Sequence, residues 1–489
     1  MLMEHSHDAV DVDQDRANRS PSPRDLQIST QMDRNPSPPP EQEGQESVEG
    51  DAIGETVYSK HWLFSTLTRL VQMVTKQEMG NQEGSDQDSE VQLPEEEEED
   101  LCKIWDMAMD RDVAGFLEEF KAAEILLGVI AKSRNPRLTE ICVGIMGNMA
   151  CFPDTCLTLS QSEDLGAVLL LLLGDADPPT LFETTRLLLT CLSHADVAPL
   201  WLERIRKQAS VLPNLCFIMC SSTKVDLLVK VGELVDKLFD LDEELMKSWI
   251  TAQHSETESD NYVHIAPSLL EAVKQLRAEN LEELEVYLHA FQLFTTVDEG
   301  IQMLAELGGP GKEAWTLLSE LVCEDLCQSD DPPIVLQEQK GLLAPTLAVL
   351  SVLFPCHGQQ DGNLEPNLPL IGSLLRVLQY LWDCQQKARA SHTNSERTHD
   401  EEEEEKDVQL QALKETATEF LANILADLTK DTLSQLVKRG YLTEQNCLAA
   451  TWSLLPQHTA VVQHMLVMLS EEEPKLSSVL KEKFPILKS

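Results

Sequence analysis

Residues 135–150, NPRLTEICVGIMGNMA, decide the fold class of this 489-residue chain. Asn135 precedes a proline, so the pair offers a capping side chain and then a residue suited to the first helical position. Apolar side chains follow at intervals of three and four residues, which is the spacing of one helix face. This apolar stripe consists of Leu138, Ile141, Cys142, Ile145 and Met149. The segment is therefore predicted to be a helix that buries its stripe against neighbouring helices.

Two later segments repeat this stripe. The first lies 43 residues further on, in DPPTLFETTRLLLTCLS at 177–193, and the second lies another 46 residues on, in 223–241. Their aligned positions are Leu181, Thr184, Thr185, Leu188 and Leu192, and then Leu227, Lys230, Val231, Leu234 and Leu238. Periods of about 40–47 residues are typical of armadillo and HEAT repeats. Because a charged lysine stands within the third stripe, a helical bundle without repeats is the alternative.

Further capping signals mark other helix starts. They are Asp177-Pro178, Thr223 with Asp226, and Asp331-Pro332-Pro333. The last of them precedes an expected helix through Leu336 and Leu343, which Pro345 should kink or end. No sustained period-two alternation or Asn-Gly hairpin turn occurs in the repeat region, so no strand is predicted there.

Shifts in composition divide the chain around the repeat region. We predict an all-α, armadillo/HEAT-like helical-repeat solenoid with a disordered acidic N-terminal tail and acidic inserts. The second half should continue the helical repeats, although no clean period can be read from it. The predicted segments are a disordered tail at 1–52, an N-terminal helix at 53–80 with its apolar run from Val57, an acidic linker at 81–97, armadillo-like repeats at 98–251, a linker at 252–262, further helical repeats at 263–390, an acidic disordered loop at 391–407 and C-terminal helices at 408–489.

The charge of the chain restricts its partners. Lys and Arg number 38 against 84 Asp and Glu, which gives a net charge of −46. Phosphate backbones and anionic membrane surfaces repel such a chain, so we expect protein partners with basic surfaces and no direct nucleic-acid or membrane binding. The alternative is that the charge only keeps a repeat protein soluble. Neither a secretory signal nor a bilayer-spanning apolar run is recognisable, which predicts residence in the nucleus or the cytoplasm.

The twelve cysteines are expected to be reduced thiols. They show neither a C-x-x-C pair nor zinc-like spacing with histidines, so no disulfide and no metal site is predicted. Seven of them lie in apolar helical stretches and should be buried: Cys142, Cys151, Cys191, Cys216, Cys220, Cys323 and Cys327.

No catalytic motif is found. The stretch GGPGK at 308–312 is similar to a phosphate-binding loop, but Glu306 and Glu313 occupy positions where that loop requires Gly and Ser or Thr. We expect it to join two helices. The nucleophile elbow, the H-E-x-x-H zinc motif and the dinucleotide fingerprint are also missing. We therefore predict a non-enzymatic protein with no cofactor.

One residue is a candidate for peptide binding, and three are candidate phosphorylation sites. Asn148 resembles the asparagine that lines the concave groove of armadillo repeats and bonds to the backbone of an extended peptide. The aligned positions in the next two segments are Cys191 and Lys237, so an asparagine ladder does not continue. A polar residue satisfied within the fold is the alternative interpretation of Asn148. The serines that precede proline, as proline-directed kinases require, are Ser20, Ser22 and Ser37.

Several longer stretches are more specific than a generic repeat. They are VYSKHWLF at 57–64 and the segments 141–152, 177–193, 225–245 and 328–340. Together they resemble the serum amyloid A-like protein family, also called synoviocyte proliferation-associated proteins, over residues 32–489. The resemblance implies an armadillo-type fold, a nuclear location and a role in promoting proliferation of synovial fibroblasts under inflammatory stimulus. It carries over no catalytic residue.

The sequence thus favours a protein-interaction scaffold that promotes cell proliferation. A nuclear transport or shuttling adaptor with a peptide groove around Asn148 is the alternative. A third hypothesis is an enzyme whose site is assembled only in the fold. The nucleus is the expected location, with the cytoplasm as alternative, because no Lys/Arg cluster resembles an import signal. The sequence predicts neither the partner's identity nor the oligomeric state.

Overall fold

The computed structural model describes residues 50–80, 93–252, 264–306, 308–328, 333–359, 364–394 and 408–488. Within these ranges the chain forms 24 α-helices and no β-strand, with one isolated bridge between Ala52 and Ser59. The predicted all-α class is therefore confirmed. The tail up to residue 49 and most of the predicted acidic inserts lie outside the described residues.

Twelve helices precede the gap at 253–263. They are α1 (Lys60–Gly80), α2 (Glu95–Met107), α3 (Arg111–Glu119), α4 (Ala122–Lys132), α5 (Pro136–Met149), α6 (Pro153–Gln161), α7 (Glu163–Leu172), α8 (Pro178–Ser193), α9 (Ala198–Lys207), α10 (Val211–Ser221), α11 (Val225–Leu241) and α12 (Glu243–Ile250).

Twelve more follow, with short 3₁₀ and π-helical segments between some of them. The α-helices are α13 (Ile265–Glu279), α14 (Glu285–Phe294), α15 (Asp298–Ala305), α16 (Gly311–Glu320), α17 (Pro333–Glu338), α18 (Lys340–Leu353), α19 (Leu368–Asn394), α20 (Val408–Ala426), α21 (Lys430–Lys438), α22 (Glu444–Leu454), α23 (Thr459–Glu472) and α24 (Pro474–Lys483). The 3₁₀ segments are η2 (Leu281–Leu284), η6 (Glu365–Asn367) and η7 (Pro485–Lys488), and the π segments are η3 (Leu321–Leu326) and η4 (Phe354–Gly358).

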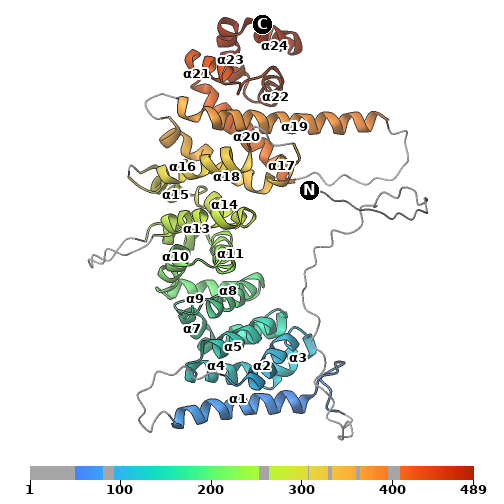
Figure 1. Cartoon of the computed structure of the whole chain (residues 1–489), viewed down its shortest axis with the longest axis vertical. Helices are drawn as coiled ribbons and strands as arrows, with labels where there is room; N and C mark the ends of the chain where they lie inside the picture. The colour runs from blue at the N-terminus through green and yellow to red at the C-terminus, as the bar shows by residue number, and fades with distance from the viewer. Residues whose placement is uncertain are drawn as a thin grey trace, which may run out of the picture.

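Six helices form a row that runs through the molecule. In order, α5, α8, α11, α14, α18 and α20 each pack on the next, and α2 packs on α5 at the N-terminal end. Figure 1 shows the helices climbing along the long axis from α1 to α24. The contact between α11 and α14 joins the two halves of the chain, although residues 253–263 separate them in sequence.

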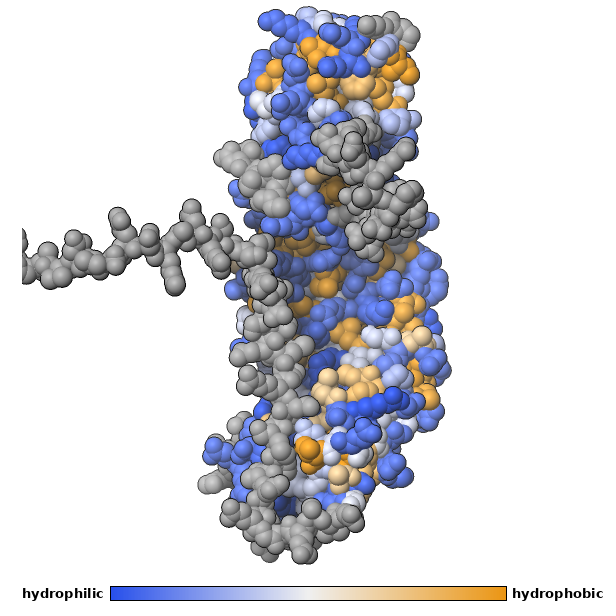
Figure 2. Space-filling model, turned by 90° about the vertical axis from the view of Figure 1, so that its right-hand side faces the viewer, coloured by the Kyte–Doolittle hydropathy of each residue, from blue (hydrophilic) through white to orange (hydrophobic). Residues whose placement is uncertain are grey.

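The row buries the three stripes that were read from the sequence. Every stripe residue on α5, α8 and α11 is buried except Lys230, which is partly buried. Its ammonium group lies 2.6 Å from Glu233 and 6.0 Å from the centre of the Phe182 ring. The charge in the third stripe therefore has a partner on its own helix and an aromatic face on the preceding row helix. The face of the molecule in Figure 2 is mainly hydrophilic, with scattered apolar patches.

The predicted caps are only partly correct. The side chain of Asn135 accepts a bond from the Leu138 amide at 3.1 Å, and Asp177 accepts one from the Thr180 amide at 3.0 Å. The cap at Thr223 is wrong, because α11 begins after Lys224 and has no side-chain cap.

The helix expected through Leu336 and Leu343 is divided in two. Helix α17 ends at Glu338 and α18 starts at Lys340, so the break precedes Pro345. Pro345 is buried inside α18 and does not end the helix, so the prediction of a helix end there is wrong. Proline lacks one backbone donor, yet α18 is continuous through Pro345 and packs on α14, α16 and α20. The predicted cap at Asp331 and Pro332 lies outside the described residues.

Two N-terminal boundaries also differ from the prediction. Helix α1 starts at Lys60 rather than at 53 or Val57, because the preceding residues form a loop in which the Ile53 amide donates to the Tyr58 carbonyl at 3.0 Å. Helix α2 starts at Glu95 and so includes acidic residues that we assigned to the linker. Two acids in the first turn of α2 are held by cations: Arg69 of α1 lies 3.4 Å from Glu97, and Arg137 of α5 lies 2.8 Å from Glu98.

All twelve cysteines are free in the structure, but not all of the seven predicted to be buried are so. Cys151 and Cys220 are exposed and Cys323 is half-buried, so for these the prediction is wrong. Cys151 lies just beyond the end of α5, and Cys220 lies in the last turn of α10. Both side chains therefore lie where the helix ends, outside its buried apolar stripe. The remaining four are buried, and burial raises the pKa of the Cys142 thiol.

Among the residues that the structure describes, one apolar stretch has the length and composition of a membrane span. It runs from Lys340 to Gly358 with a mean hydropathy of 1.5, and 61% of it is buried. Its helix, α18, contacts α14, α16 and α20. Its apolar character is thus explained by its place inside the row.

The row makes a direct prediction at Leu188, which is fully buried on α8. Replacing Leu188 with Asp should lower the free energy of unfolding by about 4 kcal/mol or more, because an unpaired carboxylate is forced into the α5–α8–α11 contact. Urea and thermal unfolding followed by circular dichroism would measure this. The matched control is Leu171→Asp on α7, where the side chain is 62% exposed and the change should stay within about 0.5 kcal/mol. A Leu188→Asp protein that unfolds like the wild type would refute the proposed register.

Candidate interaction surface

Asn148, the candidate peptide contact, is buried between α2 and α5. It is 7% exposed, and its amide nitrogen donates to the Trp105 carbonyl of α2 at 2.7 Å. The side chain therefore joins α2 to α5, in agreement with the alternative interpretation of a polar residue satisfied within the fold. Of the two aligned positions, Cys191 is buried and Lys237 pairs with Asp240 at 3.8 Å. Ser20, Ser22 and Ser37 lie outside the described residues.

Asn148 belongs to a recurrent pattern along the row. Side chains of one row helix reach main-chain carbonyls of the helix before it, in addition to the bonds within each helix. Further examples are Thr180 to the Pro136 carbonyl at 3.4 Å, Arg186 to Gly144 at 3.2 Å, His194 to Ala150 at 3.0 Å and Tyr287 to Leu228 at 2.7 Å. Such bonds fix how far each helix is shifted along its neighbour.

Glycines bring these helices close enough for the bonds to form. A Cβ atom added to Gly144 of α5 would lie 2.2 Å from the Trp105 ring, and one added to Gly147 would lie 2.7 Å from the Arg186 guanidinium. At the junction of α11 and α14, a Cβ on Gly232 would lie 2.5 Å from the Tyr287 ring. In each case a large side chain of the neighbouring helix occupies the space that a Cβ would need.

Seven charged residues form a charged strip across α2, α5, α8 and α11. They are Glu98, Arg137, Glu140, Glu183, Arg186, Lys230 and Glu233. Each cation has a carboxylate within 2.8 Å, and no side chain of the strip is more than 40% exposed. The strip therefore presents half-buried, ordered charges on four successive helices.

Electrostatic interactions link the charged strip across helices as well as within them. Burial raises the pKa of the Glu183 carboxyl, whereas Arg186 and Lys230 lower it and Glu140 raises it. These four residues come from α5, α8 and α11, so charges on neighbouring helices influence the pKa of a carboxyl on α8. Ordered carboxylates and cations of this kind can recognise complementary charges on another protein.

The described residues contain no group of three or more His, Cys, Asp or Glu side chains that could hold a metal ion. Where the structure describes it, the GGPGK stretch connects α15 to α16, as expected of a helix-to-helix loop. Its Gly311 is the first residue of α16 and packs against the Leu304 carbonyl, where an added Cβ would lie at 1.7 Å. The stretch therefore makes a tight turn between helices.

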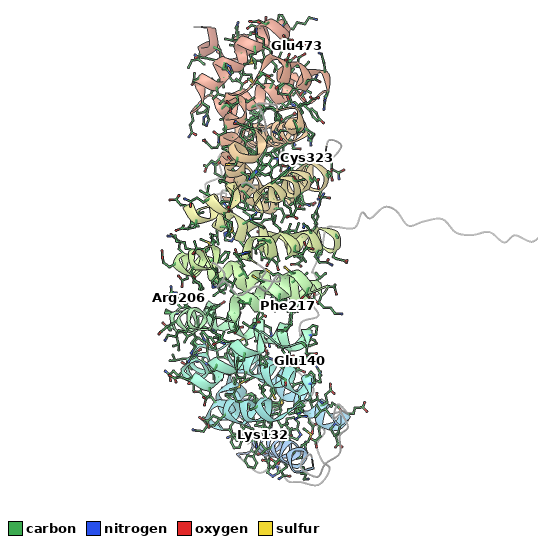
Figure 3. All side chains as sticks on the ribbon, turned by 90° about the vertical axis from the view of Figure 1, so that its left-hand side faces the viewer. Lys132, Glu140, Arg206, Phe217, Cys323 and Glu473 are labelled. Atoms are coloured by element: carbon green, nitrogen blue, oxygen red, sulfur yellow. The ribbon has the colours of Figure 1, made fainter. Side chains whose placement is uncertain are left out.

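Sequence reasoning missed two exposed apolar side chains. Leu171 of α7 is 62% exposed and Phe217 of α10 is 67% exposed. In Figure 3, Phe217 lies above Glu140 of the charged strip, and Arg206 lies toward the left-hand edge of the stack. Both helices are apolar over most of their length, so periodicity alone could not separate the outward residues from the buried ones.

Comparisons with known proteins agree with one another. A family model described as the SAAL1 C-terminal domain matches residues 211–462. The chain is 60% identical over 463 residues to "Protein saal1" of Danio rerio, covering 94% of this chain and 95% of that protein. It is 50% identical over 474 residues to "Protein SAAL1" of Homo sapiens, covering 94% and 99% of the two chains.

Among solved structures, the crystal structure of an engineered protein covers 87% of this chain and 99% of its own. It shares 13% sequence identity and a TM-score of 0.38. This similarity is too low to support an argument about the fold, which is based here on the contacts within the chain itself.

A prediction follows from the glycine at the α2–α5 contact. Gly144→Ala should lower the free energy of unfolding by about 1–3 kcal/mol, because Trp105 must move. Gly128→Ala on α4 is the control: an added Cβ there meets nothing within 4 Å, so the higher helix propensity of alanine should stabilise by up to about 1 kcal/mol. Chemical denaturation of both variants would test this. If Gly144→Ala stabilised the protein as much as Gly128→Ala does, the close contact between Gly144 and Trp105 would be contradicted.

A second prediction concerns the junction of α11 and α14. His289 Nδ1 lies 2.6 Å from Asp236 Oδ1, and this hydrogen bond raises the pKa of His289 above its ordinary value of 6.5. Because the folded-state pKa is raised, the pair stabilises the fold fully below about pH 6.5, and this contribution disappears as the pH rises through the raised pKa.

Nuclear magnetic resonance of the histidine ring protons would measure the pKa of His289 directly. In Asp236→Asn the pKa should fall, and the stability difference from wild type should shrink at alkaline pH. Glu285→Gln is the control, since Glu285 contributes less to the shift than Asp236 does. If the pKa of His289 stayed unchanged in Asp236→Asn but fell in Glu285→Gln, the shift would come from Glu285, and its assignment to Asp236 would be wrong.

Proposed function

The chain belongs to the SAAL1 (serum amyloid A-like 1) family, and from this premise we propose that it is a non-enzymatic protein-interaction scaffold that promotes cell proliferation. The proliferative role, in synovial fibroblasts under inflammatory stimulus, is what the sequence resemblance implies. Its proposed location is the nucleus, with the cytoplasm as alternative. No cofactor is part of the proposal.

We further propose that the architecture is an armadillo-like solenoid. Supporting this are three aligned stripes at spacings of 43 and 46 residues and the packing of their helices side by side. One unit cannot bury its own stripe, whereas stacked units bury their stripes jointly. Such stacking leaves one long surface, and repeat proteins use surfaces of this kind to bind other proteins.

One observation carries the scaffold proposal: the charged strip continues over four successive helices of one uninterrupted stack. A partner that contacts the strip meets ordered charges spread over α2, α5, α8 and α11 rather than a single pocket. The net charge of −46 favours partners with basic surfaces and disfavours nucleic acid and anionic membranes. The transport-adaptor alternative depended on Asn148 as a peptide contact, and the bond from Asn148 to Trp105 leaves it without support.

Capture of partners from dividing cells by the immobilised full-length protein tests this proposal. Partners would be quantified by mass spectrometry at low and moderate salt. The double substitution Glu140→Lys with Glu233→Lys reverses the charge at two carboxylates of the charged strip. It should lower the affinity for salt-sensitive partners by about tenfold, which corresponds to about 1.4 kcal/mol.

The matched control is Glu203→Lys with Glu244→Lys. Like Glu140 and Glu233, these carboxylates pair with a cation on their own helix, but they lie outside the charged strip. The control should retain the partners of the wild type. If both double variants lost the same partners to the same extent, binding would depend on the overall charge and not on the charged strip. If the wild type captured no specific partner, the scaffold proposal would be refuted.

A further inference from the structure

A groove of about 570 Å³ opens among α3, α4, α6 and α7. Its inner lining is apolar and consists of Leu127, Met149, Phe152, Leu159 and Leu165. The volume lies within the range of about 300–1,000 Å³ that is usual for ligand sites. In Figure 3 this level of the stack is marked by Lys132, the last residue of α4.

The groove exists partly because α3 has a glycine on its wall. A Cβ built on Gly115 meets no atom within 4 Å, so a larger side chain there would extend into free space. The row glycines differ, because the neighbouring helix already fills the space beside them. The groove is thus an unfilled apolar surface, whereas Gly144, Gly147 and Gly232 of the row serve close packing.

The rim of the groove is acidic. It holds four carboxylates, those of Glu118, Glu119, Glu124 and Asp154, against two cations. Both cations are paired, Arg111 with Asp154 at 3.4 Å and Lys121 with Glu124 at 3.2 Å.

Glu118 accepts a hydrogen bond from Thr158 at 2.5 Å. In the described part of the chain, neither Glu118 nor Glu119 has a cation within salt-bridge distance. Two rim carboxylates are therefore free to take a cation from outside, unlike the carboxylates of the charged strip.

We propose that this groove binds a short segment of a partner protein in which apolar side chains are flanked by Lys or Arg. The inference rests on the proposed scaffold function and names a site and a partner chemistry for it. Apolar side chains of the segment would be buried on the lining, where an unpaired charge would be costly. Its flanking cations would pair with Glu118 and Glu119, and the overall negative charge of the chain would speed the encounter.

The charge and the shape act together in this proposal, and the experiment must separate them. A chain with a net charge of −46 attracts any lysine-rich peptide, so salt dependence alone does not locate the site. A variant that fills the groove without changing any charge does locate it. Gly115→Trp is such a variant, and Gly128→Trp is its match, because Gly128 is also a helical glycine with free space but does not line the groove.

The probes are short fluorescein-labelled peptides with a central pair of leucines, phenylalanines or one of each, flanked by lysines, serines or glutamates. Fluorescence anisotropy with the full-length protein should give tightest binding for lysine flanks. Gly115→Trp should weaken that binding by about tenfold or more, equivalent to about 1.4 kcal/mol, and Gly128→Trp should leave it unchanged. Circular dichroism would confirm that both variants fold.

A second variant keeps the test decisive if Gly115→Trp fails to fold. Glu118→Lys combined with Glu119→Lys changes two rim residues, and should shift the preference from lysine-flanked to glutamate-flanked peptides. Equal affinities of Gly115→Trp and Gly128→Trp, or no binding of any peptide to the wild type, would overturn the groove proposal. Suppose that Gly115→Trp keeps all captured partners and that Glu140→Lys with Glu233→Lys loses them. The groove proposal alone would then be overturned, and the scaffold function would stand.

Discussion

The contact between successive row helices is the constraint on which the rest of the structure depends. A helix carbonyl that already accepts a bond from its own helix accepts a second one from a neighbouring side chain, as the Gly144 carbonyl does from Arg186. Each such bond adds only about 0.5–1.5 kcal/mol. Their main effect is geometric: the donors reach their acceptors only at one longitudinal shift and one close distance, which Gly144, Gly147 and Gly232 permit. Apolar burial makes the row stable, and these bonds make its register unique.

The same contacts determine how the charge of the chain is distributed. The chain has 38 cations against 84 acids, and its cations pair with carboxylates both within helices and between them. Arg277 of α13, for example, lies within 3.2 Å of three carboxylates, those of Glu320, Glu324 and Asp325. Arg277 thus links α13 by charge to α16 and η3, while the chain as a whole keeps an excess of acids. The proposed preference for basic partners is based on this excess.

The sequence was informative where local chemistry and tertiary packing agree. Asn135 and Asp177 cap their helices and precede stripes that are buried, so both helices and their period could be predicted. In the second half the row continues through α14, α18 and α20, but π segments at η3 and η4 and a break at Gln339 disturb the spacing. A repeat that is preserved in space but not in sequence spacing cannot be found by aligning stripes.

The functional surfaces were harder to predict for a related reason. Asn148 has the expected residue type at the expected place, yet whether its amide faces a groove or a neighbouring helix depends on Trp105, which lies 43 residues earlier. The groove combines α3, α4, α6 and α7, and it is open because Gly115 lacks a side chain there, whereas the same residue type at Gly144 marks the closest packing. The sequence alone does not reveal whether a helical glycine leaves a groove open or permits a close helix contact.

Helix α5 connects these surfaces to one another. All residues from Ile141 to Ala150 are buried, and the helix contacts α2, α4 and α8 together. Its carbonyl at Gly144 holds Arg186 of the charged strip, and its last residue, Met149, is part of the groove lining. In a stack whose stability is a sum of units and interfaces, a partner seated in the groove would therefore press on the helix that also positions the charged strip. The two surfaces are separate in chemistry, but they share one structural support.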